Sequence, residues 1–192
     1  MKSRLIWCTA LLALIGFCTA AGQDPMPPQS SSLPVGSATI AEVKGEVALH
    51  GPRGEALTAQ RGEVLAADST IETQKGNLLL DLQDGSQVLV KPHSRVVLRD
   101  PNQGKGFYLE LLIGKIVNKV QKRLGNTPSF RMGTPTAVVT VRGTRFEVEV
   151  TKKLRTYVAV YEGLVEVAGL NGRAPPVMVQ PGFTTKDRKS VV

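Results

Sequence analysis

Few residues of this chain have the type and spacing that catalysis requires. The two histidines, His50 and His93, stand alone in the sequence, so neither has the neighbours of a metal site or a proton-transfer pair. Asp81 and Asp84 have the spacing of an acid and base pair, but Asp84 belongs to an Asp-Gly turn and Asp81 to the polar face of a strand. We therefore predict that none of these four side chains is catalytic.

Other reactive patterns are equally weak. Glu147 and Glu149 share a strand face with Arg145, which is typical of a solvated cross-strand charge pattern. The Gly-Lys-Gly segment 104–106 lacks the spacing and the following helix of a phosphate loop, and no serine lies in a nucleophile elbow. The sequence predicts a protein that is not an enzyme and that binds no metal or cofactor.

The N-terminus has the layout of a secretory signal peptide. Residues 1–21 combine a basic head at Lys2 and Arg4 with an apolar run and small residues at its end. Both cysteines, Cys8 and Cys18, lie in this segment, so its removal would leave no thiol for disulfides or catalysis. We predict cleavage and a periplasmic or secreted protein with no membrane span; if the segment were retained, the protein would be membrane-anchored.

The chain is basic, with a formal net charge of +8. Outside the membrane, the anions that such a charge meets are phospholipid, lipopolysaccharide and wall polymers, so we predict no nucleic-acid partner. A set of basic and aromatic residues is a candidate anion-binding or partner surface: Lys115, Lys119, Lys122, Arg123, Lys152, Lys153, Arg155, Tyr157 and Tyr161. The simpler alternative is scattered solubilising charge on strands and turns.

Almost every segment after residue 38 places apolar residues at the two-residue period of a β-strand. We therefore expect strands to position these residues. Residues 77–92 (NLLLDLQDGSQVLVKP) predict a hairpin with a type I′ turn at Asp84-Gly85. Segments 107–113 and 115–120 are two further predicted strands, separated by Gly114. Glycine followed by an alternating apolar pair recurs at irregular intervals, as in stacked supersecondary units. The predicted fold is all-β, either a short β-solenoid or a two-sheet sandwich of antiparallel strands and hairpins, after an N-terminal signal helix.

The predicted domain has boundaries set by composition. Residues 22–37 are crowded with Pro, Ser, Gln and Gly and predict a flexible linker. The β-domain is expected at 38–182. Residues 183–192 are predicted to be a C-terminal tail.

Residues 134–150 (TPTAVVTVRGTRFEVEV) contain the most regular strand pattern. Phe146, Val148 and Val150 alternate with charged residues, so one face of this strand is predicted to be buried. Segment 137–141 is apolar on both faces and predicts an interior strand covered on each side. Gly143 joins the two, and a basic turn leads on to the next strand, so we expect consecutive antiparallel neighbours.

This stretch, followed by VYEGLVEV, resembles the FecR domain, named for the periplasmic regulator of iron-dicitrate uptake. The resemblance covers roughly 38–182, and we assign a structural role to the residues that carry it: Thr134, Pro135, Ala137, Val141, Arg142, Gly143, Thr144, Phe146, Val148, Glu162 and Gly163. It implies a module of envelope signalling, in which full-length regulators join a cytoplasmic anti-sigma segment and a membrane helix to a periplasmic part that reads the state of a transporter. Only Met1 to Arg4 precede the apolar segment here, and the chain ends about ten residues past Gly182, so a free-standing exported module is expected.

The resulting prediction is a non-catalytic binding module whose partner is another envelope protein. Two alternatives stay open: a module that binds a polyanionic glycan or wall polymer, and a membrane-anchored envelope regulator. The sequence leaves the oligomeric state undetermined.

Overall fold

Alternation of buried and partly exposed side chains along the chain produces strands throughout the computed structural model. The structure describes residues 34–104, 106–122, 130–170 and 175–188. The predicted signal peptide, linker residues 22–33, Arg123 and the last four residues lie outside these ranges. The described residues form sixteen strands and no helix, which confirms the all-β prediction.

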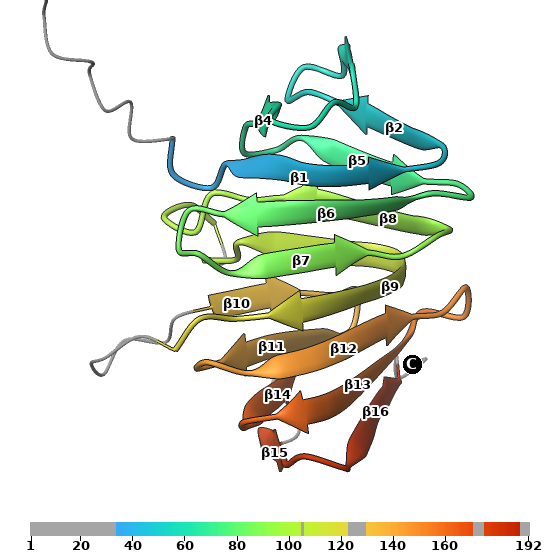
Figure 1. Cartoon of the computed structure of the whole chain (residues 1–192). Helices are drawn as coiled ribbons and strands as arrows, with labels where there is room; N and C mark the ends of the chain where they lie inside the picture. Colours follow the sequence, from blue (N-terminus) through green and yellow to red (C-terminus); the bar gives the residue numbers. More distant parts are fainter. Residues whose placement is uncertain (1–33, 105, 123–129, 171–174, 189–192) are drawn as a thin grey trace, which may run out of the picture. The chain divides into compact units, whose positions relative to one another are not determined.

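The strands lie in two layers that share one strand (Figure 1). Sheet A contains, in spatial order, β4 (Val64–Leu65), β1 (Ala38–Lys44), β6 (Asn77–Leu82), β7 (Gln87–Val90), β9 (Leu109–Lys119), β12 (Arg145–Val150), β13 (Arg155–Glu162) and β16 (Thr184–Arg188). Sheet B contains β3 (Ala56–Leu57), β2 (Val47–His50), β5 (Thr70–Thr73), β8 (Ser94–Leu98), β9 again, β10 (Phe130–Gly133), β11 (Ala137–Val141), β14 (Val165–Gly169) and β15 (Val177–Val179). The chain crosses repeatedly between the layers, which matches the two-sheet alternative of the prediction, although β9 and β10 pair in parallel and not antiparallel.

The core fills the space between the layers. Inward-facing residues such as Phe146 and Val148 of sheet A and Val139 of sheet B have no exposed surface. Burial of apolar side chains on both inner faces stabilises the sandwich, as it does in other two-sheet folds.

Strand β9 joins the two sheets at Gly114. Its first half pairs with β8 in sheet B, and its second half pairs with β7 and β12 in sheet A. The buried positions shift by one residue at this point, from Leu109 and Leu111 to Ile116 and Asn118. The two predicted strands are therefore one strand, and the predicted break at Gly114 is the crossing between layers.

The hairpin of β6 and β7 forms as expected, but its predicted turn type is wrong. A type I′ turn needs positive φ at both central residues, and only Gly85, at 79°, has it. The loop has three residues: Gly85 N donates to Leu82 O (3.0 Å) and Leu82 N to Ser86 O (2.8 Å). The carboxylate of Asp84 accepts bonds from Ser86 N and Oγ, both 2.9 Å long, and this local capping favours the longer loop.

Strands β11 and β12 are not neighbours, contrary to the prediction. β11 pairs with β10 and β14 in sheet B, whereas β12 pairs with β9 and β13 in sheet A. The turn at 142–144 thus carries the chain from one layer to the other. The prediction that β11 is covered on both faces is also wrong, because Val138 and Thr140 on its outer face are half-buried. The expected hairpin of β12 and β13 is present.

The folded region extends beyond the predicted boundaries. β16 pairs with β13 over residues 184–188, which the sequence assigned to a tail. At the other end, Ser37 N donates to Pro34 O (3.1 Å), and Gln83 Nε2 donates to the same carbonyl. Backbone pairing needs no particular side chain, so polar composition alone placed both boundaries too far inward.

Candidate functional site

The Thr-Pro-Thr turn between β10 and β11 is tied to the opposite layer by hydroxyl groups. The buried Oγ1 of Thr156, on β13, lies 2.9 Å from Thr134 Oγ1 and 2.7 Å from Thr136 Oγ1. Thr134 Oγ1 also accepts a hydrogen bond from Ala137 N (2.9 Å). Pro135, between these threonines, is half-buried. These contacts give the Thr-Pro-Thr segment a structural task, since they connect the sheets through the core.

The turn Arg142-Gly143-Thr144 is closely packed except for its arginine. Gly143 has φ of 62°, and a Cβ there would lie 2.6 Å from Lys122 Cβ. Thr144 is buried, its carbonyl accepts a bond from Val120 N (2.9 Å), and its Cγ2 lies against Gly163. Arg142 is exposed and forms no ion pair with any described residue. This arginine is therefore the part of the turn that is free to contact another molecule.

The outer face of β12 carries a charge cluster with its neighbours in sheet A. Lys115 Nζ lies 3.0 Å from Glu147 Oε1 and 3.1 Å from Glu149 Oε2. Tyr161 donates to Glu147 Oε2 (3.2 Å), and the Arg145 guanidinium lies over the tyrosine ring, 5.9 Å from its centroid. The hydrogen bond to Glu147 is the main reason why the pKa of Lys115 is raised, and the hydrogen bond to Glu149 is the second. Partial burial is the main reason why the pKa of the Tyr161 phenol is raised, and the negative charge of Glu147 is the second.

The predicted basic surface is divided between the two ends of β12. Lys119 pairs in register with Arg145 at the start of this strand. Lys152 and Lys153 lie in the turn at its far end, where β13 begins with Arg155. Lys115 is paired with Glu147 and Glu149, and Lys122 lies beside Gly143. Tyr157 and Tyr161 are on β13, and Arg123 is outside the described residues. The described members form no single continuous basic face.

A groove with an apolar floor crosses the outer face of sheet A. It has a volume of about 460 Å³, and we call it the sheet A groove; its lining residues are Leu79, Gln87, Leu89, Val117, Lys119, Arg145 and Glu162. The three aliphatic residues are register neighbours across β6, β7 and β9, and each is half-buried. The polar residues form the next row across β7, β9, β12 and β13.

Sequence reasoning missed this groove, although a signal for it was present. Leu79 lies within the run Leu78-Leu79-Leu80, and Leu89 within Val88-Leu89-Val90. A strand with one wet face should alternate, so an uninterrupted apolar run indicates an apolar residue on the outer face.

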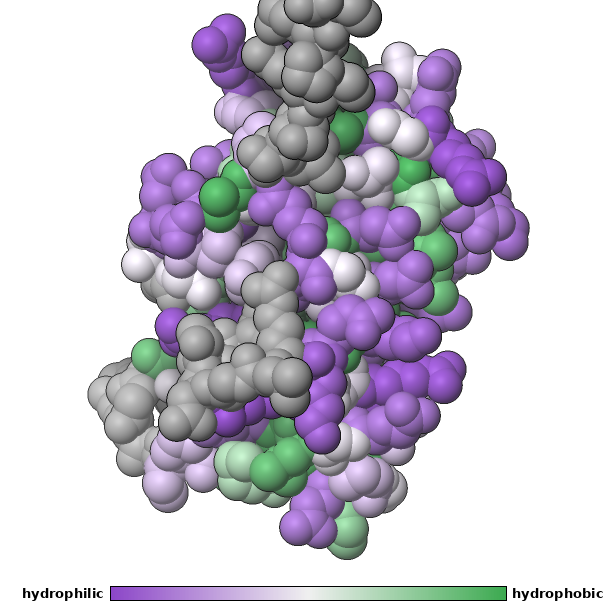
Figure 2. Space-filling model, turned by 60° about the vertical axis from the view of Figure 1, so that its left-hand side comes forward, coloured by the Kyte–Doolittle hydropathy of each residue, from purple (hydrophilic) through white to green (hydrophobic). Residues whose placement is uncertain are grey.

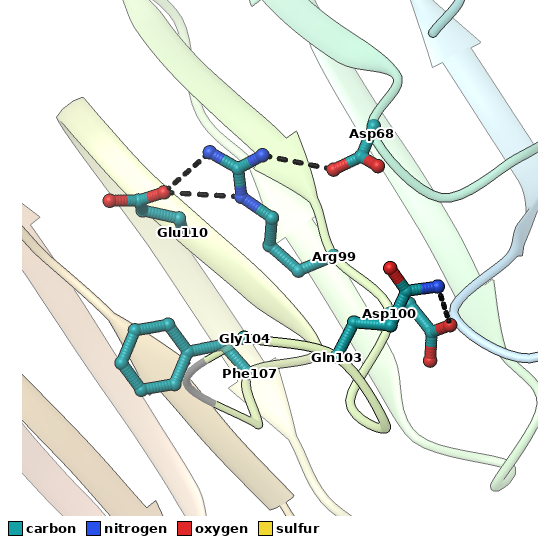
Figure 3. A pocket seen from close by; sticks show the side chains of 7 residues that line it. All are labelled: Asp68, Arg99, Asp100, Gln103, Gly104, Phe107 and Glu110. Carbon is teal, nitrogen blue, oxygen red and sulfur yellow. Dashed lines mark hydrogen bonds and ion pairs between the residues drawn. The ribbon is translucent and has the colours of Figure 1, made fainter.

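A second cavity, of about 470 Å³, lies beside the loop between β8 and β9 (Figure 3). Arg99 reaches across it, with Nη2 2.8 Å from Glu110 Oε2 and Nη1 2.9 Å from Asp68 Oδ1. The hydrogen bond to Glu110 raises the pKa of Arg99. Asp100 accepts a hydrogen bond from Gln103 within the loop (2.9 Å). The charged side chains that line this cavity are thus paired with one another. We assign them a structural role, in which the ion pairs of Arg99 hold the start of this loop to β9 and to Asp68.

The isolated titratable residues lie apart from one another. His50 is in β2, His93 is in an exposed turn, and Asp81 Oδ1 accepts a hydrogen bond from Gln87 Nε2 (2.9 Å). Within the described ranges, no three His, Cys, Asp or Glu side chains are close enough to hold a metal ion. Nor do those ranges include a helix of the length and apolar character that crossing a membrane requires.

Comparison with known proteins gives one family. The model of the FecR protein family matches residues 69–166, which run from the residue before β5 into β14. No curated protein matches the chain significantly. Two crystal structures of a proposed anti-sigma factor from Parabacteroides distasonis, at 1.65 and 2.50 Å resolution, are similar to this chain, each with 20% sequence identity and a TM-score of 0.49. The similarity covers 62% of this chain and 59% of theirs, so the chain spans about three-fifths of the length of those proteins.

Proposed function

Because the chain belongs to the FecR protein family, we propose that it regulates envelope signalling by binding another protein, without catalysis. Membership of this family supports the regulatory part of the proposal. The binding part depends on one observation, the apolar floor of the sheet A groove.

The floor of the sheet A groove is the feature that favours a protein partner. Leu79, Leu89 and Val117 form an apolar strip beside a row of polar and charged residues. Covering such a strip stabilises a complex by about 25 cal/mol per Å² of apolar surface removed from water. Aliphatic side chains of a polypeptide can cover it, whereas a sugar polymer offers mostly hydroxyl groups.

The rim of the groove suggests the chemistry of that partner. Lys119 and Arg145 are register neighbours on one side, and Glu162 provides the opposite charge. The contact of Arg145 with the Tyr161 ring restricts the arginine, which lowers the entropy cost of binding. A segment with aliphatic residues and charges of both signs would match this groove.

Export is the second part of the proposal. The basic head, apolar run and small residues of 1–21 support secretion to the periplasm or beyond, where an envelope partner would be met. N-terminal sequencing of the protein from cells tests this: a start near Ala21 to Gln23 is expected, and a start at Met1 would contradict it.

The groove is tested with Leu89→Asp. This change places a charge on the apolar floor and should abolish capture of an envelope protein by the immobilised chain. Val138→Asp is the matched control, because Val138 is half-buried on the outer face of sheet B. The captured protein is identified by mass spectrometry, purified and titrated against all three forms, each with its melting temperature measured.

Three outcomes would oppose the proposal. Equal capture by wild type and Leu89→Asp would place the partner elsewhere. Equal loss in both variants would show a general effect of the added charge. Retention of the chain on purified anionic glycan, with no protein captured, would favour the polymer-binding alternative.

A further inference from the structure

Exposed apolar side chains are concentrated near the C-terminal end of the described chain. Of its eight clearly exposed large hydrophobic residues, six lie between positions 161 and 183: Tyr161, Leu164, Leu170, Val177, Met178 and Phe183. Figure 2 shows hydrophobic residues gathered at the lower end of that view, at the height of β14 and β15 in Figure 1. Tyr161 belongs to the charge cluster of sheet A, so the six residues do not form one patch, but an exposed apolar patch among them is typical of an interaction site.

Two of these residues line a groove on the outer face of sheet B. The groove has a volume of about 600 Å³, and we call it the sheet B groove; its lining residues are Arg131, Thr140, Val141, Arg142, Leu164, Glu166 and Met178. Leu164 is 44% exposed and Met178 is 52% exposed. The groove therefore offers two long, accessible apolar side chains beside two arginines.

The register of sheet B explains how these groups come together. Arg131, Thr140, Glu166 and Met178 form one row across β10, β11, β14 and β15. Because Val141 is paired with Val165, the residues just beyond them, Arg142 and Leu164, lie at the same end of β11 and β14. The arginine that follows β11 is thus placed next to an exposed leucine.

The two arginines differ in how they are held. The Arg131 guanidinium lies 5.7 Å from the centroid of the Phe107 ring, which orients it. Arg142 is exposed, and in the part of the chain that the structure describes it has no carboxylate partner. An unpaired guanidinium beside apolar surface is suited to bind a carboxylate, with which it can form two parallel hydrogen bonds.

Charge also argues against a second copy of this chain as the occupant. The formal net charge is +8, so two copies of the chain repel one another, and the two arginines of the groove outnumber its single carboxylate, that of Glu166. An acidic partner is attracted by the same charges. We propose that the sheet B groove binds an extended segment of a partner protein, with a carboxylate against Arg142 and aliphatic side chains against Leu164 and Met178.

This proposal goes beyond the function proposed above, because it concerns the other layer of the sandwich. A synthetic peptide of alternating leucine and glutamate is the probe, with counterparts in which lysine or glutamine replaces glutamate. Binding to the full chain is measured by fluorescence anisotropy. The glutamate peptide should bind wild type better than the glutamine peptide, and the lysine peptide should bind least.

Charge reversal tests the role of the arginine. Arg142→Glu should weaken binding of the glutamate peptide by about five- to tenfold and strengthen binding of the lysine peptide by a similar factor. Arg61→Glu is the matched control, since Arg61 is an exposed arginine in the turn before β4 and gives the same change of net charge. Leu164→Ser should weaken the glutamate and glutamine peptides alike, because it removes only apolar contact. Circular dichroism of each variant verifies the fold.

Several results would overturn the proposal. Equal losses in Arg142→Glu and Arg61→Glu would show unspecific attraction, and equal binding of the lysine peptide by wild type would show that no carboxylate is selected. A concentration-dependent dimer that Leu164→Ser abolishes would assign the groove to a second copy. Leu89→Asp should leave peptide binding unchanged, which keeps this test separate from that of the sheet A groove.

Discussion

Substitution of Gly114 by alanine tests whether the crossing of β9 between the sheets depends on a missing side chain. Gly114 has φ of 99°, and a Cβ there would lie 2.6 Å from Ser94 Cβ and even nearer to Ser94 Oγ and Cα. Ser94 cannot withdraw easily, because its Oγ accepts a hydrogen bond from Lys115 N (2.9 Å) and its N donates to Thr73 Oγ1 (3.0 Å). The clash therefore involves the backbone of β8 as well as a side chain.

The expected loss is the sum of three effects. Left-handed backbone strain costs about 1–3 kcal/mol, overpacking about 1–3 kcal/mol, and a broken buried hydroxyl bond about 1 kcal/mol. A total of about 3–7 kcal/mol is a large part of the about 5–15 kcal/mol that stabilises a typical domain. It corresponds to a fall in melting temperature of roughly 6–28 °C for a chain of this size.

The assay is urea and thermal unfolding followed by far-ultraviolet circular dichroism, with Gly62→Ala as control. Gly62 also has positive φ, 87°, but a Cβ there meets nothing within 4 Å, so we expect a loss of only about 1 kcal/mol. Adding Ser94→Gly to Gly114→Ala should restore part of the lost stability, because it removes the Ser94 side chain from the clash. The recovery should be incomplete, because the contact with the Ser94 backbone remains. Equal losses at Gly114 and Gly62 would refute the reasoning.

Three further predictions concern the family motif and the charge cluster. Gly143→Val should destabilise the domain by about 2–4 kcal/mol, because its side chain would meet Lys122 at positive φ; an unchanged melting temperature would contradict this. Thr156→Val should lower the free energy of unfolding in urea by about 1–3 kcal/mol, since the buried hydroxyls of Thr134 and Thr136 lose a hydrogen-bond partner. A smaller decrease would mean that these hydroxyls find new partners. Lys115→Met should cost about 0.5–1 kcal/mol at neutral pH. The pairing with Glu147 raises the pKa of Lys115 above its ordinary value of 10.5. The difference in unfolding free energy between wild type and Lys115→Met should therefore be present at neutral pH and vanish as pH rises through the raised pKa. A difference that is constant with pH would exclude the ion pair as its cause.

Local pattern predicted the strands well because burial alternates with the pleat. Phe146 and Val148 were expected on a buried face, and both have no exposed surface. The turn between β12 and β13 was expected between two alternating strands, and it is present. The break at Gly114 was also visible, since this glycine separates the two apolar segments 107–113 and 115–120. Each of these features depends on residues within a few positions of one another.

Strand partners and layer assignments were not predictable in the same way. All strands present the same backbone donors and acceptors, so alternation shows which face is buried but not which strand lies alongside. For this reason β11 and β12 were expected to pair, although Gly143 sends them to different layers. The strand nature of 184–188 was missed because its pairing with β13 is a backbone property.

The candidate sites show the same division. The sequence by itself identified the family stretch, the strand periods and the isolation of His50 and His93, because residue type and short spacing suffice for these. Only the tertiary structure brought Val117 beside Leu89 and placed Arg142 beside Leu164. Those neighbours come from strands that are far apart in the sequence, and their proximity is decided by strand pairing and register within each sheet, which is a cooperative property of the whole sandwich.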